Sequence, residues 1–148
     1  MTILIRPFES GDLDSVVQIE NQVFTTPWSK QSFLDCSRWP EFWFRVAEQN
    51  KKVVGYFVAQ VVPPEAELHN IAVDPAFQKK GVGRLLLSHL LTEIKKVGVK
   101  DVFLLVRPSN IAAIHLYQQF EFCLLDKRPR YYEDTKEDAL IFYKALDT

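Results

Sequence analysis

The hydrophobic pattern of the chain alternates between helical and strand-like periods. Apolar residues recur at helical spacing over 13–23 and again over 82–97, which predicts two amphipathic helices, and a further helix is expected over 111–120. Shorter runs rich in β-branched and aromatic residues predict strands. The expected strands cover residues 3–8, 42–48, 53–62, 65–73, 102–106, 122–127 and 139–145.

Capping and turn residues divide these runs. Ser10 is expected to cap the first long helix, and Ser29 to start a second, short one. Asn50-Lys51 predicts a hairpin turn, and Gly98 can end the helix over 82–97 in a left-handed conformation. Several expected strands follow one another without a helix between them. This order predicts an α/β fold with a mixed sheet flanked by helices, and not a fully parallel doubly wound sheet.

Length, charge and composition exclude several classes of protein. Residues 1–148 are enough for one domain, and no Gly/Ser-rich linker divides them. The net charge of −1 and the sequence pI of about 6.3 argue against a general nucleic-acid or membrane-surface binder. The first residues lack the long apolar stretch that is typical of a signal peptide, and no apolar run approaches the roughly 20 residues of a membrane span. Cys36 and Cys123 lie far apart without metal-ligand spacing, so we expect a cytoplasmic protein without a metal.

A glycine-containing segment lies between the expected strand 65–73 and the helix over 82–97. Its residues are Gln78, Lys79, Lys80, Gly81, Val82, Gly83 and Arg84. Glycines let a backbone approach a bulky anion, and the unpaired N–H groups of a helix's first turn favour phosphate oxygens. Three basic side chains add positive charge. The spacing fits neither the Walker pattern nor the dinucleotide fingerprint, and a glycine turn that opens an ordinary helix is the alternative.

A second cluster follows the expected strand 102–106. Asn110 can cap the next helix, and Tyr117 lies seven residues beyond it, about two turns, so both face the same way. Taken singly, the two are better explained as a cap residue and a core aromatic. The two clusters in this order are a more specific signal of function than either cluster alone.

Together these segments resemble the GNAT acetyltransferases. The Gln-x-x-Gly-x-Gly loop is similar to the family's acetyl-CoA pyrophosphate loop. The resemblance implies a GNAT fold and an acetyl-CoA co-substrate that is bound by this loop and by Asn110. It also implies that Tyr117 faces the thioester sulfur and protonates the departing thiolate, while a strand N–H stabilises the oxyanion. The strand residues concerned are Ile71, Ala72 and Val73.

Further segments resemble the RimI group of this family, whose members acetylate the N-terminal alanine of a small-subunit ribosomal protein. Thr26-Pro27-Trp28-Ser29 and the Arg-x-Ser-Asn run that begins at Arg107 carry this resemblance. It implies that the partner is a protein N-terminus and that Trp28, Tyr131 and Tyr132 contact it. Trp28 could instead pack beside a helix start, and the tyrosines could be exposed aromatics in a strand connection.

Two positions depart from the family pattern. RimI-type enzymes carry a Glu two residues before the Arg-x-Ser-Asn run, and here that position is Leu105, which cannot accept a proton. Glu121 stands where the family usually has Gly, so a left-handed backbone there would cost about 1 kcal/mol.

The missing carboxylate leaves the proton acceptor open. Glu67 occupies a strand position that resembles that of the catalytic Glu in histone lysine acetyltransferases, and we expect it to take the proton through water. His69 is the reserve candidate, on the same strand face if no bulge intervenes. Each could equally be an ordinary solvated or packed strand residue.

Two other functions fit the sequence. The first is an acetyltransferase for a small amine such as a polyamine or an antibiotic, against which the aromatic acceptor residues count mildly. The second is a domain that binds acetyl-CoA without turnover, for which Leu105 is the support. The oligomeric state is not predicted.

Overall fold

One mixed sheet of seven strands runs through the computed structural model, which describes residues 2–146. The strands are β1 (Leu4–Pro7), β2 (Phe42–Gln49), β3 (Lys52–Val62), β4 (Glu65–Val73), β5 (Asp101–Val106), β6 (Cys123–Arg128) and β7 (Ala139–Ala145). The helices are α1 (Leu13–Val23), α2 (Lys30–Arg38), α3 (Val82–Lys96) and α4 (Ile111–Gln119), with short 3-10 turns η1 (Ser10–Asp12) and η2 (Pro75–Phe77). The strand order is β1-β2-β3-β4-β5-β7-β6, with β4 and β5 parallel and the other neighbours antiparallel. The predicted mixed α/β sheet is confirmed.

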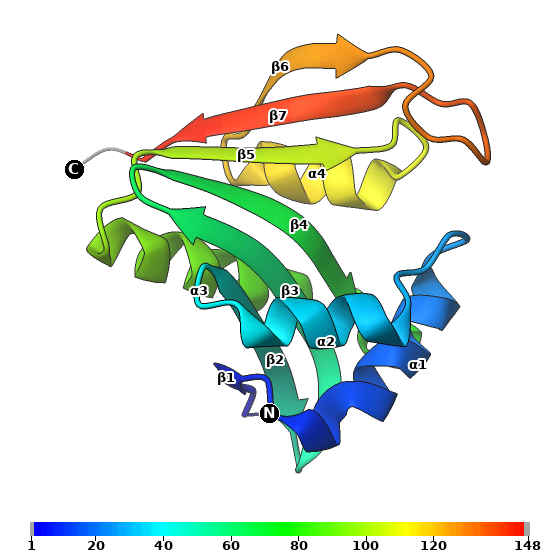
Figure 1. The fold of residues 1–148 in the computed structure, drawn as a ribbon, viewed down its shortest axis with the longest axis vertical. Helices are drawn as coiled ribbons and strands as arrows, with labels where there is room; N and C mark the ends of the chain where they lie inside the picture. The colour runs from blue at the N-terminus through cyan, green and yellow to red at the C-terminus, as the bar shows by residue number, and fades with distance from the viewer. Residues whose placement is uncertain (1, 147–148) are drawn as a thin grey trace.

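Helices cover both faces of the sheet (Figure 1). α1 and α2 pack against one face, in a core that contains Val16, Phe33 and Tyr56. α3 and α4 pack against the other face, where Leu86 and Leu90 are buried. Within residues 2–146, no helix is both long and apolar enough to cross a membrane.

Most of the predicted helix and turn signals are confirmed. Ser29 caps α2, and its hydroxyl accepts a hydrogen bond from the Ser32 N–H at 3.1 Å. Asn50 and Lys51 have φ angles of 50° and 64°, as in the primed turns that join hairpin strands. Gly98 follows α3 with a φ of 95°. These residues therefore fix where the elements begin and end.

The predicted cap at Ser10 is wrong. Ser10 begins the η1 turn, and α1 starts only at Leu13. The Asp12 carboxylate accepts the Glu9 N–H at 2.8 Å and is itself held by Arg6 at 2.8 Å. Asp12, paired with Arg6 of β1, therefore fixes the start of the η1 turn in place of the Ser10 hydroxyl. A charged acceptor holds a backbone N–H more strongly than a hydroxyl does.

Glu121 adopts the left-handed conformation in which the family usually has Gly. Its φ is 66°, and it lies two residues after Gln119, the last residue of α4. The strain expected for a side chain in this region is about 1 kcal/mol. The chain thus keeps the backbone turn that the resemblance implies, at a small cost in stability.

Gly55 of β3 allows α3 to approach the sheet closely. A Cβ at this position would lie 3.0 Å from the Ala72 carbonyl oxygen and 3.1 Å from the Leu86 side chain. Gly55 is also paired with Val73, the last residue of β4. A larger residue would therefore push the start of α3 away from the end of β4.

Replacing Gly55 with Ala is expected to lower the free energy of unfolding by about 1–3 kcal/mol, because the new methyl group would overpack against a backbone carbonyl. Urea denaturation measures this loss. Gly11→Ala is the matched control, since a Cβ at Gly11 meets nothing within 4 Å. Equal stabilities of the two variants would contradict the close packing at Gly55.

Candidate active site

A cleft opens where β4 and β5 separate. The two strands pair only from Glu65 to Leu68 and from Asp101 to Leu104, and beyond these residues the pairing ends. The cleft has a volume of about 440 Å³. The α1–α2 connection, β4, β5, the start of α4 and Tyr132 line it. Its volume is within the range of small-molecule sites in proteins.

A β-bulge at His69 reshapes β4 in this cleft. Leu68 pairs with Ala59 and Asn70 pairs with Val58, so the backbone of His69 is opposite no residue of β3 in the register. Leu68 packs on the α3 side of the sheet, whereas the Asn70 side chain reaches a carboxylate of α1 on the other side. The bulge therefore shifts the alternation of side chains by one residue. A bulge also bends its strand, which accounts for the separation of β4 from β5.

The two candidate proton acceptors lie side by side despite the bulge. Nε2 of His69 is 3.6 Å from Oε2 of Glu67 and 3.2 Å from Oε1 of Gln60. His69 lines the cleft, whereas Glu67 lines an adjoining groove. Leu105 lines both spaces and brings no ionisable group to either. The Glu67 carboxylate is therefore close to the cleft through its contact with His69.

The segment 78–84 has the backbone expected of an anion site. Lys79 and Gly81 have φ angles of 63° and 88°, and Gly81 precedes α3 without a side-chain cap. The first N–H groups of α3 are therefore free to bind a ligand. The Gln78 side chain donates a hydrogen bond to the Val73 carbonyl at 3.1 Å, which ties the segment to the end of β4.

The two predicted motifs are adjacent in space. Arg84 of α3 hydrogen-bonds to Gln119 of α4, and a Cβ on Gly83 would lie 3.5 Å from the Leu116 side chain. Asn110 caps α4, and its side-chain oxygen accepts a backbone N–H at 3.2 Å. The start of α3 therefore contacts the C-terminal half of α4, and the N-terminal cap of α4 at Asn110 lines the cleft.

Tyr117 lines the cleft from α4 while most of its ring is buried. The residue is 5% exposed, and its ring centroid lies 5.9 Å from that of Phe122 and 6.5 Å from that of Phe142. Burial raises the pKa of the Tyr117 phenol well above its ordinary value. The hydroxyl therefore keeps its proton at neutral pH and is able to donate it.

Trp28 and Tyr132 both line the cleft, and Tyr131 does not. Trp28 lies on the α1–α2 connection, and Tyr132 lies between β6 and β7. The Arg107 guanidinium stacks 4.0 Å from the centroid of the Tyr132 ring. Tyr131 is 48% exposed and touches Tyr132 edge-on. Two of the three predicted acceptor residues therefore line the cleft.

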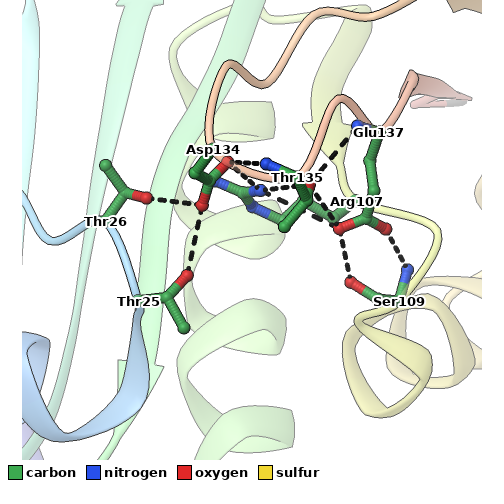
Figure 2. A network of polar contacts seen from close by, with 7 residues as sticks. All are labelled: Thr25, Thr26, Arg107, Ser109, Asp134, Thr135 and Glu137. Atoms are coloured by element: carbon green, nitrogen blue, oxygen red, sulfur yellow. Dashed lines mark hydrogen bonds and ion pairs between the residues drawn. The ribbon is translucent and has the colours of Figure 1, made fainter.

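A polar network that the sequence did not reveal joins the two connections that flank the cleft (Figure 2). The Asp134 carboxylate accepts hydrogen bonds from the hydroxyls of Thr26 at 2.7 Å and Thr25 at 3.3 Å. Arg107 donates to the same carboxylate at 2.7 Å and so lowers the pKa of Asp134. The network thus holds the α1–α2 connection against the β6–β7 connection over the cleft.

Glu20 is a further residue of the cleft that the sequence analysis did not single out. It is 1% exposed in α1, and its carboxylate lies at the cleft. It accepts the Trp28 N–H and the Asn70 side-chain amide, each at 2.9 Å, and the Tyr56 hydroxyl. A signal existed, because Glu20 lies four residues after the buried Val16, on the apolar face of α1.

Replacing Gly81 with Val is expected to raise the Kd for acetyl-CoA about tenfold or more, because a β-branched residue resists the left-handed φ of 88° on which the segment depends. Isothermal titration calorimetry measures the change. Gly98→Val is the matched control: its φ of 95° imposes the same strain at the other end of α3. Unchanged affinity in the Gly81 variant would contradict a backbone phosphate site.

Comparison with known proteins agrees with this geometry. Residues 13–122 match the acetyltransferase (GNAT) family. The [Ribosomal protein bS18]-alanine N-acetyltransferase of Escherichia coli K12 is 41% identical over 139 residues, 93% of each chain. The enzyme of that name from Haemophilus influenzae is 34% identical over 87% of each chain.

Solved structures give the same result. The crystal structure of the ribosomal-protein-S18-alanine N-acetyltransferase from Escherichia coli superposes with a TM-score of 0.92 at 38% identity, over 99% of this chain and 96% of that one. Ard1 from Thermoplasma volcanium also gives a TM-score of 0.92, at 30% identity over 100% of each chain. The chain therefore belongs to the acetyltransferase (GNAT) family, and its predicted resemblance to the RimI group is confirmed.

Proposed function

We propose that this chain transfers an acetyl group from acetyl-CoA to the N-terminal alanine of the small-subunit ribosomal protein bS18. The observation that carries the proposal is the cleft between β4 and β5, which combines a buried tyrosine, a histidine beside a carboxylate, and two aromatic side chains on the connections above it. The names of relatives at 34% and 41% identity support the choice of acceptor.

The residues at the start of α3 suit the diphosphate of acetyl-CoA. The left-handed Lys79 and Gly81 and the uncapped N-terminus of α3 leave N–H groups for phosphate oxygens. Lys80 and Arg84 add positive charge. Asn110 and the backbone of Ile71, Ala72 and Val73 would hold the remainder of the molecule. When bound, acetyl-CoA supplies the acetyl thioester.

The side chains of the cleft divide the proton transfers between them. A backbone N–H in the last three residues of β4, Ile71, Ala72 and Val73, stabilises negative charge that develops on the acetyl oxygen. The Tyr117 phenol donates a proton to the departing sulfur. His69 accepts a proton from the acceptor amine, directly or through water, and the Glu67 carboxylate stabilises the charged imidazole.

An N-terminal amine tolerates the absence of a carboxylate at Leu105 better than a lysine does. The reference pKa of an α-amine is about 7.7–8.0, so an appreciable fraction is neutral near pH 7.5. A lysine with a pKa of about 10.4 is about 0.1% neutral at that pH. A weak proton acceptor therefore suffices for an N-terminal alanine.

A single assay tests the proposal. The purified chain is incubated with isotope-labelled acetyl-CoA, bS18 and a mixture that contains an N-blocked lysine peptide and polyamines, and mass spectrometry locates the label. Label at the bS18 α-amine alone is expected. Label on the polyamines would make the chain a small-amine acetyltransferase. Tight binding of acetyl-CoA without any transfer would favour a domain that binds without turnover, the alternative that Leu105 raises.

A further inference from the structure

A second groove adjoins the cleft on the face of the sheet that carries α1 and α2. It has a volume of about 410 Å³ and lies over the paired parts of β4 and β5 and the facing part of β7. α1 and α2 lie over β2, β3 and β4, so this part of the sheet face stays open in front of β5 and β7 (Figure 1). We call this space, lined by Val62, Phe103, Leu105, Ile141, Glu65 and Arg128 among others, the sheet groove.

Strand alternation explains why apolar side chains line the sheet groove. Leu104 of β5 and Phe142 of β7 point into the core beneath α4, so their neighbours point to the opposite face. These neighbours are Phe103, Leu105 and Ile141, and none of the three is fully buried. Half-buried apolar side chains around a concave space gain free energy when a ligand covers them.

The sheet groove is continuous with the cleft. Leu105 lines both, and the Glu67 carboxylate in the groove lies 3.6 Å from the His69 ring in the cleft. An acceptor whose amine lies beside His69 therefore has the groove as its neighbour. The space is concave and about the size of a small-ligand pocket, so it suits a side chain better than the flat face of a second protein copy.

We propose that the sheet groove binds an apolar or aromatic side chain at the third or fourth residue of the acceptor protein. This inference rests on the proposed function, in which the acceptor is a protein N-terminus. The groove follows β5 from Leu105 to Phe103 and β4 from Glu67 to Glu65, two strand residues or about 7 Å. An extended acceptor advances about 3.3 Å per residue from its N-terminal amine, so its third and fourth residues reach this distance along the groove.

A peptide scan tests the position. Peptides that begin with Ala and continue with Ser and Gly carry one Phe at position 2, 3, 4, 5 or 6, and kcat/KM is measured for each. Phe at position 3 or 4 is expected to raise kcat/KM about tenfold over the Phe-free peptide, through KM, because burial of an aromatic ring favours binding. Equal values at all positions would overturn the proposal while leaving acetylation of the α-amine intact.

Two variants identify the groove as the source of the preference. Val62→Ser and Phe103→Ala are each expected to reduce the tenfold Phe preference to about twofold. Val97→Ser, at a similarly exposed valine after α3, is the matched control and is expected to keep it. If Val62→Ser keeps the full preference, or if it dissociates a dimer in sedimentation without altering the preference, the groove does not bind the acceptor. If no peptide is acetylated, the proposed function fails, and fluorescence anisotropy of labelled peptides then decides on the groove alone.

Discussion

The Tyr117→Phe variant is expected to turn over about 10²- to 10⁴-fold more slowly than the parent, with acetyl-CoA affinity little changed. The substitution removes the hydroxyl and keeps the ring that packs between Phe122 and Phe142, so it tests proton donation and not packing. General acid catalysis commonly contributes a factor of this size. Steady-state kinetics on an Ala-initiated peptide measure kcat, and calorimetry measures the affinity for acetyl-CoA.

Tyr131→Phe is the matched control for Tyr117→Phe. Tyr131 is 48% exposed and does not line the cleft, so its hydroxyl should be dispensable for turnover. Thermal unfolding of both variants checks that the fold is retained. Parent-like turnover by Tyr117→Phe would make this residue a core aromatic, which was the alternative that the sequence left open.

The pKa of Tyr117 bears on the pH dependence of the reaction. Burial raises this pKa above the ordinary tyrosine value of about 10, so the phenol stays protonated throughout the range in which the acceptor amine loses its proton. The rate should therefore rise with pH through the α-amine pKa of about 7.7–8.0 and then stay level to about pH 9.5. A fall in kcat/KM between about pH 8 and 9 in a stable protein would contradict a proton donor with a raised pKa.

The parts of the site that were predictable from sequence are those that depend on backbone near one another in the chain. Two glycines at a helix start predict the anion-binding segment 78–84, and Gly81 has a φ of 88° in the structure. Asn110 and Tyr117 are related by helical spacing alone, and α4 places them as expected. Such signals are local because caps, turns and helix faces are set by a few consecutive residues.

The parts that were not predictable depend on contacts between distant segments. The hydroxyl of Thr26 donates to the Asp134 carboxylate across 108 residues of chain, and although Thr26 belongs to the segment that resembles the RimI group, no local pattern predicts this contact. The bulge at His69 arises from the pairing of β4 with β3, which the sequence of β4 alone does not contain. Glu20 is a charged residue on the apolar face of α1, and such a break in the apolar pattern is the sequence signal for a buried polar network.

The choice between His69 and Glu67 as the proton acceptor follows from the bulge. His69 lines the cleft and Glu67 lies behind it, with their nearest nitrogen and oxygen 3.6 Å apart. We therefore expect His69→Gln to lower kcat/KM at pH 7 by about 10²-fold, the lower end of the range for general base catalysis. Glu67→Gln should cost about tenfold, because it removes only the carboxylate that stabilises the charged ring.

The pH dependence of the His69→Gln defect provides the test. At pH 9 most of an α-amine with a pKa of about 7.7–8.0 is already neutral, so the defect should shrink to about tenfold or less. His115→Gln is the matched control, since His115 lies on the exposed side of α4 and hydrogen-bonds to Gln119. Measurements of kcat/KM from about pH 6.5 to 9.5 on an Ala-initiated peptide decide the matter. If neither His69→Gln nor Glu67→Gln lowers kcat/KM at pH 7, the amine must enter the cleft already neutral. No side chain then needs to replace the carboxylate that is missing at Leu105.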